Sequence, residues 1–160
     1  MQIPKNLPQF EKRPALFVSS GEYEAKFYIA LNGSLDLKAE IKMPPREEAR
    51  EKQAFVGIKS GRYGLAAVSH HGAYVEDLKK KFARKIHSAI HGLLAEYKFQ
   101  EIYFFAPRYV TSRVIEKLDK AERKKVRMII NKELIKVNPL VMVRMFWQET
   151  QSAIAPSRQD

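Results

Sequence analysis

Apolar and polar residues alternate in two stretches near the start of the chain, and a short apolar run precedes them. Residues 15–20 (ALFVSS) form the apolar run, which is typical of a buried strand. Residues 24–31 (EAKFYIAL) and 35–42 (LDLKAEIK) alternate, as strands with one buried face do. The pattern therefore predicts three strands, the second and third facing inward with Ala25, Phe27, Ile29, Leu31, Leu35, Leu37, Ala39 and Ile41.

The pair Asn32-Gly33 between the two alternating stretches indicates a hairpin turn. A two-residue loop would place Ile29 opposite Asp36 and put the apolar faces out of step. A three-residue loop, residues 32–34, or a bulge would pair Ile29 with Leu37 instead. We expect that second register, because a slip of one residue turns every side chain to the other face.

Residues 74–97 show apolar positions at spacings of three and four, which predicts a long amphipathic helix. Its apolar stripe contains Val75, Leu78, Phe82, Ile86, Ile90, Leu93, Leu94 and Tyr97. Glu76 and Asp77 are expected in its first turn, where the helix dipole favours negative charge. A basic face, made of Lys80, Arg84, His87 and His91, is expected opposite the stripe.

The second half of the chain continues this mixture of strands and helices. The pattern predicts strands at 101–107 and 127–134 and a helix at 109–118. The capping pattern of Asp119 and Glu122 predicts a short helix that continues to about Val126. A last helix is expected at 138–148, capped by Asn138 and with Pro139 in its first position. The order predicts a single three-layer α/β domain, with an N-terminal antiparallel hairpin in a mixed sheet and helices packed on it.

The expected organisation of the 160 residues is one domain with short flanking segments. Residues 1–13 are expected to be an N-terminal extension, 14–150 the domain, and 151–160 a disordered tail. Residues 44–72 lack firm periodicity and contain the glycine-rich stretch GIKSGRYGLAAVSHHG, so a long flexible loop is expected there.

Charge changes the picture, because the net charge is +11 with histidine neutral. Residues 79–85 (KKKFARK) contain five cationic side chains and no acid, and 120–127 (KAERKKVR) contain five and one glutamate. Such clusters attract polyanions, so we expect RNA or the ribosome as the partner. The candidate nucleic-acid-binding residues are Lys59, Arg62, Tyr63, His70, His71, Lys79, Lys80, Arg84, Lys85, His87, His91, Arg108, Lys120, Arg123, Lys124 and Lys125.

Catalytic motifs are weak in this sequence. There is no cysteine, no phosphate-binding G-x-x-x-x-G-K-[ST] motif and no G-x-S-x-G elbow around Ser69. The stretch HSAIH (87–91) has Ser88 where the H-E-x-x-H zinc motif has glutamate. We therefore predict no catalytic residues, no metal and no cofactor, while a hydrolase that uses the histidines stays a weaker alternative.

The cellular setting follows from what the sequence lacks. No apolar run approaches the about 20 residues of a membrane span, and the N-terminus has no apolar signal region. We expect a cytoplasmic protein with no membrane partner, either a monomer or a homodimer, since an unpaired edge strand leaves pairing between subunits open.

Residues 82–118 carry a family resemblance. Phe82-Ala83-Arg84 near the start of the long helix, Ala106-Pro107 at the end of a strand, and then Arg108, Arg113 and Leu118 resemble the host attachment protein family, which is similar to the middle domain of archaeal and eukaryotic peptide-chain release factors. The resemblance covers roughly residues 14–146. It implies the RNase H-like fold of that middle domain and a translation-associated role.

Release factors carry Gly-Gly-Gln in the loop before this helix, where it promotes peptidyl-tRNA hydrolysis. The corresponding place here reads Gly61-Arg62-Tyr63-Gly64, so peptide release is not expected. The resemblance instead implies an RNA- or ribosome-binding protein without that activity. The alternative is a protein-interaction or host-attachment module with no nucleic-acid role.

Overall fold

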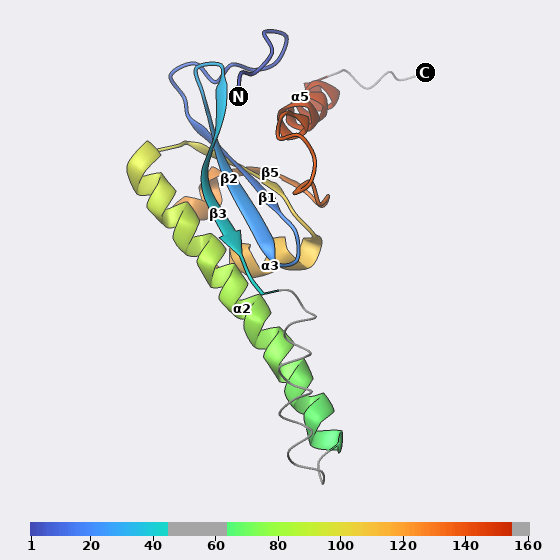
Figure 1. Cartoon of the computed structure of the whole chain (residues 1–160). Helices are drawn as coiled ribbons and strands as arrows, with labels where there is room; N and C mark the ends of the chain where they lie inside the picture. Colours follow the sequence, from blue (N-terminus) through green and yellow to red (C-terminus); the bar gives the residue numbers. More distant parts are fainter. Residues whose placement is uncertain (45–63, 155–160) are drawn as a thin grey trace.

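The computed structural model of the chain describes residues 1–44 and 64–154, and for residues 64–71 it describes the backbone alone (Figure 1). Its centre is a five-stranded sheet in the order β3-β2-β1-β4-β5. The strands are β1 (Ala15–Ser20), β2 (Glu24–Leu31), β3 (Ser34–Lys42), β4 (Glu101–Phe105) and β5 (Val126–Ile130). β2 runs antiparallel to both of its neighbours, while β1, β4 and β5 are parallel.

Helices cover both faces of this sheet. They are α2 (Gly64–Tyr97), α3 (Arg108–Lys117), α4 (Lys120–Lys125) and α5 (Leu140–Ile154). Side chains of α2 and α3 belong to the core cluster on one face, and side chains of α5 belong to the cluster on the other. The expected three-layer α/β domain with a mixed sheet and an N-terminal hairpin is confirmed.

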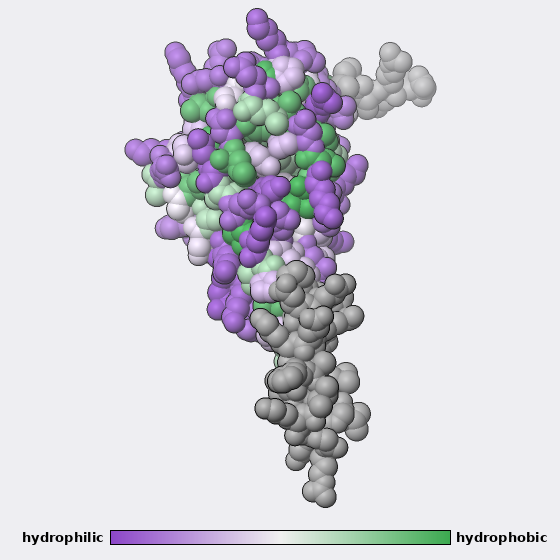
Figure 2. All heavy atoms as spheres, in the orientation of Figure 1, coloured by the Kyte–Doolittle hydropathy of each residue, from purple (hydrophilic) through white to green (hydrophobic). Residues whose placement is uncertain are grey.

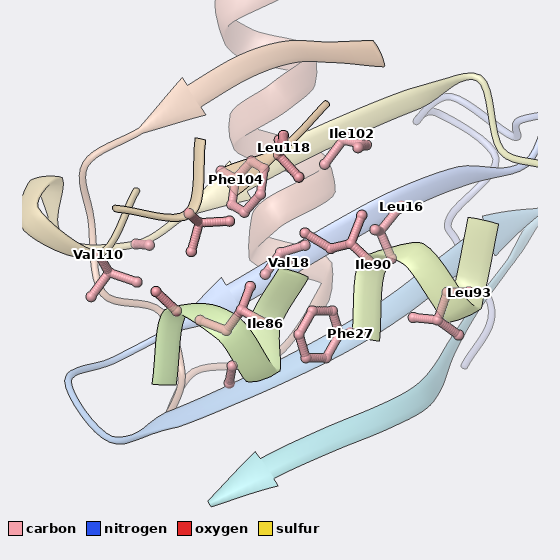
Figure 3. Close-up of a cluster of buried hydrophobic side chains, with 14 of the residues drawn as sticks. Leu16, Val18, Phe27, Ile86, Ile90, Leu93, Ile102, Phe104, Val110 and Leu118 are labelled. Carbon is pink, nitrogen blue, oxygen red and sulfur yellow. The ribbon is translucent and has the colours of Figure 1, made fainter. Parts of the chain in front are cut away.

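The core between α2 and the sheet follows from the apolar stripe of the helix. Ile86 and Ile90 are fully buried, and they lie against Val18 and Phe27 of the central strands (Figure 3). Burying one such side chain is worth about 1.5–3 kcal/mol relative to leaving it exposed. This packing fixes which side of α2 faces the sheet and therefore which side faces solvent.

The opposite core joins α5 to the start of the chain. Ile3 and Leu7 are buried there with Met142 of α5. Two aromatic side chains lie at its centre, with the ring centroids of Tyr103 and Phe146 4.4 Å apart. The first residues also reach the edge of the sheet, since Gln2 makes an isolated antiparallel bridge with Ser34.

The expected hairpin register is wrong. Ile29 pairs with Asp36, because Asn32 and Gly33 form a two-residue turn in which both have positive φ (48° and 78°). A bulge further along brings the apolar residues of the two strands back to the same face. Phe27 pairs with Ala39 while its neighbour Tyr28 pairs with Leu37, so Lys38 is the extra residue.

The prediction that Leu35, Leu37, Ala39 and Ile41 of β3 all face the same core is therefore correct for only two of them. Ala39 and Ile41 pack against the α2 core, as expected. Leu35 belongs to the opposite core instead, and Leu37 is 48% exposed. The bulge is the physical reason, because one extra residue reverses the faces of the residues that follow it.

The long helix begins ten residues before the expected position, at Gly64. Residues 64–72 are therefore helical, and the flexible loop expected at 44–72 is wrong for that part. Leu65, Ala66 and Ala67 are strong helix formers, and extending an already packed helix costs little. Glu76 and Asp77 consequently lie inside the helix and not in its first turn.

Three other elements end two or more residues from the expected position. β4 ends at Phe105 because Pro107 has no N–H group and precedes α3. β5 ends at Ile130, since its single partner β4 offers no residues beyond that point. α5 continues to Ile154, past the last buried apolar side chain.

Both expected helix caps are confirmed. Asp119 and Glu122 form a reciprocal capping box at the start of α4. The side-chain oxygen of Asn138 accepts a hydrogen bond from the backbone N–H of Leu140 at 3.0 Å.

Replacing Gly33 with Ala should destabilise the protein by about 1 kcal/mol, because alanine is strained at a φ of 78°. Gly92 is a matched control, since it lies on an open side of α2 with no atom within 4 Å of an added Cβ. Gly92→Ala should stabilise the protein by about 1 kcal/mol. Urea denaturation of both variants checks the prediction, and a change of the same sign in both would contradict it.

Candidate nucleic-acid interface

The 34 residues of α2 give it a length of about 51 Å at 1.5 Å per residue. Its N-terminal half extends beyond the sheet (Figure 1). From Leu78 onward, apolar side chains at helical spacing face the core. Lys80, Arg84 and His91 are exposed on the other side, as the sequence pattern predicts. Figure 2 shows hydrophilic side chains over much of the face along which α2 runs.

The short helix α4 lies beside α2 and brings the second cationic cluster next to the first. The contact that joins them is between His87 Nε2 and Glu122 Oε1, at 3.4 Å. Lys120 and Lys124 of α4 are exposed. We call the set Lys80, Arg84, His87, His91, Lys120 and Lys124 the α2–α4 surface.

Glu122 is the buried anchor of this contact, with 2% of its surface exposed. Its Oε1 atom also accepts a hydrogen bond from the backbone N–H of Asp119, at 3.3 Å. Its Oε2 atom is buried and has no hydrogen-bond partner among the described residues. A buried carboxylate is costly unless it is paired, so the His87 imidazole is the group that offsets this cost when it is protonated.

Asp119 shows that α4 begins close to His91. The hydrogen bond from the backbone N–H of Glu122, at 2.7 Å, is the main cause that holds the pKa of Asp119 below its usual range. The nearby charge of His91 lowers this pKa further. Asp119 therefore stays ionised as the cap of α4 at neutral pH.

Two candidate phosphate-binding residues have partners within the molecule. Lys79 lies 3.7 Å from a carboxylate oxygen of Glu76, and its Nζ atom lies 5.4 Å from the ring centroid of Tyr109. Arg123 donates hydrogen bonds to the backbone carbonyls of Ile115 (3.0 Å) and Glu116 (3.1 Å). Arg123 therefore helps to close the C-terminal end of α3.

The remaining candidates lie in several places. Lys85 is exposed on α2, Arg108 is exposed at the start of α3, and Lys125 is half-buried on α4. His70 and His71 belong to the first turns of α2, but their side chains lie outside the described part. Lys59, Arg62 and Tyr63 lie outside the described residues altogether, so their contact with nucleic acid stays a prediction.

Sequence reasoning missed two features of this region. The capping pattern identified Glu122, but nothing in it indicated that the carboxylate would be buried against His87. Lys42 was not a candidate, although it lies with Arg84 and Lys85 around one open hollow between β3 and α2. The charged residues that alternate along residues 36–42 are the only sequence signal for it.

A second hollow, of about 670 Å³, has a lining of mixed charge. It lies where β1 ends, and it is lined by three carboxylates (Glu22, Glu24 and Glu133) and two lysines (Lys42 and Lys136). Burial, and then the charges of Glu22 and Glu133, raise the pKa of nearby Tyr109 to about 12. Within the described ranges, no group of three or more His, Asp or Glu side chains could hold a metal ion.

In the described part of the chain, no helix has the length and apolar character that crossing a bilayer requires.

The fold and surface define a class: a three-layer α/β domain with a mixed sheet and a cationic helical surface. The protein family described as "Protein required for attachment to host cells" matches residues 23–144, which is more than half of the chain. The chain belongs to this family, as the resemblance of residues 82–118 predicts. No curated protein sequence matches it.

Solved structures give weaker similarities. An archaeal translation termination factor, aRF1, has a TM-score of 0.43 and 12% identity, over 88% of this chain and 39% of that chain. A chain described as "Archaeal protein" has a TM-score of 0.44 and 12% identity, over 88% and 38%. The Aquifex aeolicus Ppx/GppA phosphatase has a TM-score of 0.30 and 14% identity, over 74% of this chain and 35% of that chain. The chain thus spans about two fifths of the length of the first two structures.

The contact between His87 and Glu122 can be tested with a double-mutant cycle. His87→Ala should lower the free energy of unfolding by about 1–3 kcal/mol, because it removes the side chain that contacts the buried Glu122 carboxylate. In a Glu122→Gln background the same change should cost less, with a coupling of about 1 kcal/mol or more. Urea denaturation of the four proteins measures this, and an equal cost in both backgrounds would contradict it.

Proposed function

We propose that the chain binds RNA through the α2–α4 surface. The observation that carries the proposal is that two cationic clusters, about 40 positions apart in the sequence, lie side by side where His87 meets Glu122. A concentrated field of this kind attracts phosphate groups more strongly than the same charges spread over a surface.

The lysine and arginine side chains of this surface form no ion pair with the described acids. Among the described residues, no carboxylate lies within 4.0 Å of the side-chain nitrogens of Lys80, Arg84, Lys120 or Lys124. The acids of α2 nearest to them pair elsewhere: Glu76 with Arg113 at 2.7 Å, and Asp77 with Lys81 at 3.2 Å. The exposed lysines and Arg84 are therefore free to contact phosphates.

RNA is the polyanion to test first because of the sequence of residues 82–118, whose resemblance extends to release-factor middle domains. Phosphate contacts from lysine and arginine position a protein on nucleic acid without reading its sequence. The proposed function is accordingly binding to RNA or to the ribosome, with no catalytic step assigned to these side chains.

The double variant Lys80→Glu/Arg84→Glu should lower RNA affinity about tenfold or more at low salt, because it replaces two phosphate contacts with repulsion. The control is Lys5→Glu/Arg144→Glu, which makes the same charge change at exposed positions associated with the opposite face of the sheet. It should retain near-normal binding. Fluorescence anisotropy with labelled RNA at several salt concentrations measures both.

Equal losses in the two variants would mean that net charge alone governs binding, and this result would contradict the assignment to the α2–α4 surface. A second readout compares the salt dependence of binding in the wild-type protein and in the Lys80→Glu/Arg84→Glu variant. The slope of log K against log salt should be less steep in the variant, by about 0.7–0.9 for each phosphate contact removed.

The family description favours a second function, attachment to host cells, in which the surface would contact another protein and not RNA. Cell fractionation separates the two. Protein that stays with the cell envelope after ribonuclease treatment would favour attachment, and protein released from ribosomal fractions by ribonuclease would favour RNA binding.

A further inference from the structure

We propose that the groove between α2 and the edge strand β3 binds a single-stranded segment of the RNA. This inference rests on the proposed function and adds to it the form of nucleic acid that the protein prefers. The groove was not predicted from the sequence, because it is built from elements on either side of residues 43–63.

The groove is an open hollow of about 500 Å³ between the two elements. Three cationic side chains line it: Lys42 from β3, and Arg84 and Lys85 from α2. Arg84 also belongs to the α2–α4 surface, so the groove and that surface meet along one side of α2. A polyanion that binds the surface can continue into the groove without crossing a region of negative charge.

The charge balance of the groove favours an anion. Among the residues that the structure describes, no carboxylate lies within 4.0 Å of the side-chain nitrogens of Arg84 or Lys85. Glu40 is the single acid in the lining, and it lies 3.5 Å from the Nζ atom of Lys42, which offsets its charge. The net charge of the lining is therefore positive even before a ligand approaches.

The apolar part of the lining suits the ribose and the base of a nucleotide. Ala39 and Ile41 from β3 and Ala89 from α2 line the hollow between the cationic side chains. Small apolar side chains let a ribose or a base approach closely, while the cations at the rim contact the phosphates. Ser88 adds a hydroxyl group that can donate or accept a hydrogen bond.

An aromatic side chain lies further along the same junction. Lys38 of β3 places its Nζ atom 5.5 Å from the ring centroid of Tyr97 of α2. Tyr97 lies eight residues beyond Ala89, or about 12 Å along the helix. Surfaces that bind single strands combine cationic side chains with aromatic rings, and this junction supplies one of each.

The size of the hollow distinguishes a single strand from a duplex. A single backbone with its unstacked bases can lie between a helix and a strand edge. A duplex carries two backbones on a stiff rod and would touch only the rim, where Arg84 and Lys85 are exposed. The groove therefore adds affinity for single strands that a duplex does not gain.

The test compares a labelled 12-nucleotide single-stranded RNA with a hairpin duplex of the same length, using anisotropy. Ser88→Trp fills the groove from an exposed position of α2 without changing charge. It should weaken single-strand binding about tenfold and leave duplex binding unchanged. Ser152→Trp is the matched control, because Ser152 is exposed on α5, which packs on the opposite face of the sheet, and it should change neither.

A second variant, Lys42→Gln/Lys85→Gln, leaves Arg84 and the α2–α4 surface intact. It should lower the single-strand salt slope by about 1.4, at about 0.7 per phosphate contact. Thermal unfolding of each variant verifies that the fold is retained.

The outcomes separate this inference from the proposed function. One outcome would overturn the groove proposal and leave the RNA-binding surface standing. In that outcome Ser88→Trp and Lys42→Gln/Lys85→Gln bind the single strand normally, while Lys80→Glu/Arg84→Glu loses binding. Wild-type protein that prefers the duplex would also overturn the groove. Wild-type protein that binds neither RNA would overturn both.

Discussion

The packing of α2 against the sheet is the interaction on which the rest of the molecule depends. Ile86 and Ile90 are buried among side chains of β1, β2 and β4, and no other described helix contributes as many residues to that core. Because this contact fixes the rotation of the helix about its axis, it also decides which cationic side chains reach solvent. The electrostatic surface is thus a consequence of hydrophobic packing.

A helix fixed in this way has two different flanks. On one flank it meets α4 through the pair of His87 and Glu122, a contact made of charge and burial. On the other flank it approaches β3 without closing the gap, and small side chains such as Ala39 and Ala89 leave that gap open. Arg84 lies between the two flanks. The same element can therefore be rigidly supported on one side and accessible to a ligand on the other.

Much of the fold could be predicted from the sequence, because period-two and period-3.6 patterns report burial directly. β1 and β2 match their predicted ranges, and both capping motifs form as expected. The start of α2 was missed because glycine was interpreted as a break, although a packed helix tolerates Gly72. The hairpin register was missed because Lys38 has no partner on β2, and no local pattern marks such an extra residue.

The candidate site was predictable only in part, for a related reason. Sequence clustering identifies cations, but it does not show which of them already have partners. Lys79 contacts Tyr109, and Arg123 bonds to carbonyls of α3, so both depend on tertiary contacts between helices. Lys42 reaches the groove only because β3 is an edge strand. Pairings of this kind connect residues far apart in the chain, which a local pattern does not contain.

The extra residue in β3 has a consequence for how the protein behaves at high concentration. An edge strand with regularly spaced backbone groups is a template on which strands of other molecules can assemble. At Lys38 that spacing is interrupted, and the long charged side chain reaches over Tyr97. A foreign strand would have to break its own ladder at this point and bury an ammonium group. The irregularity that aligns the hairpin therefore also makes the β3 edge a poor template for a foreign strand.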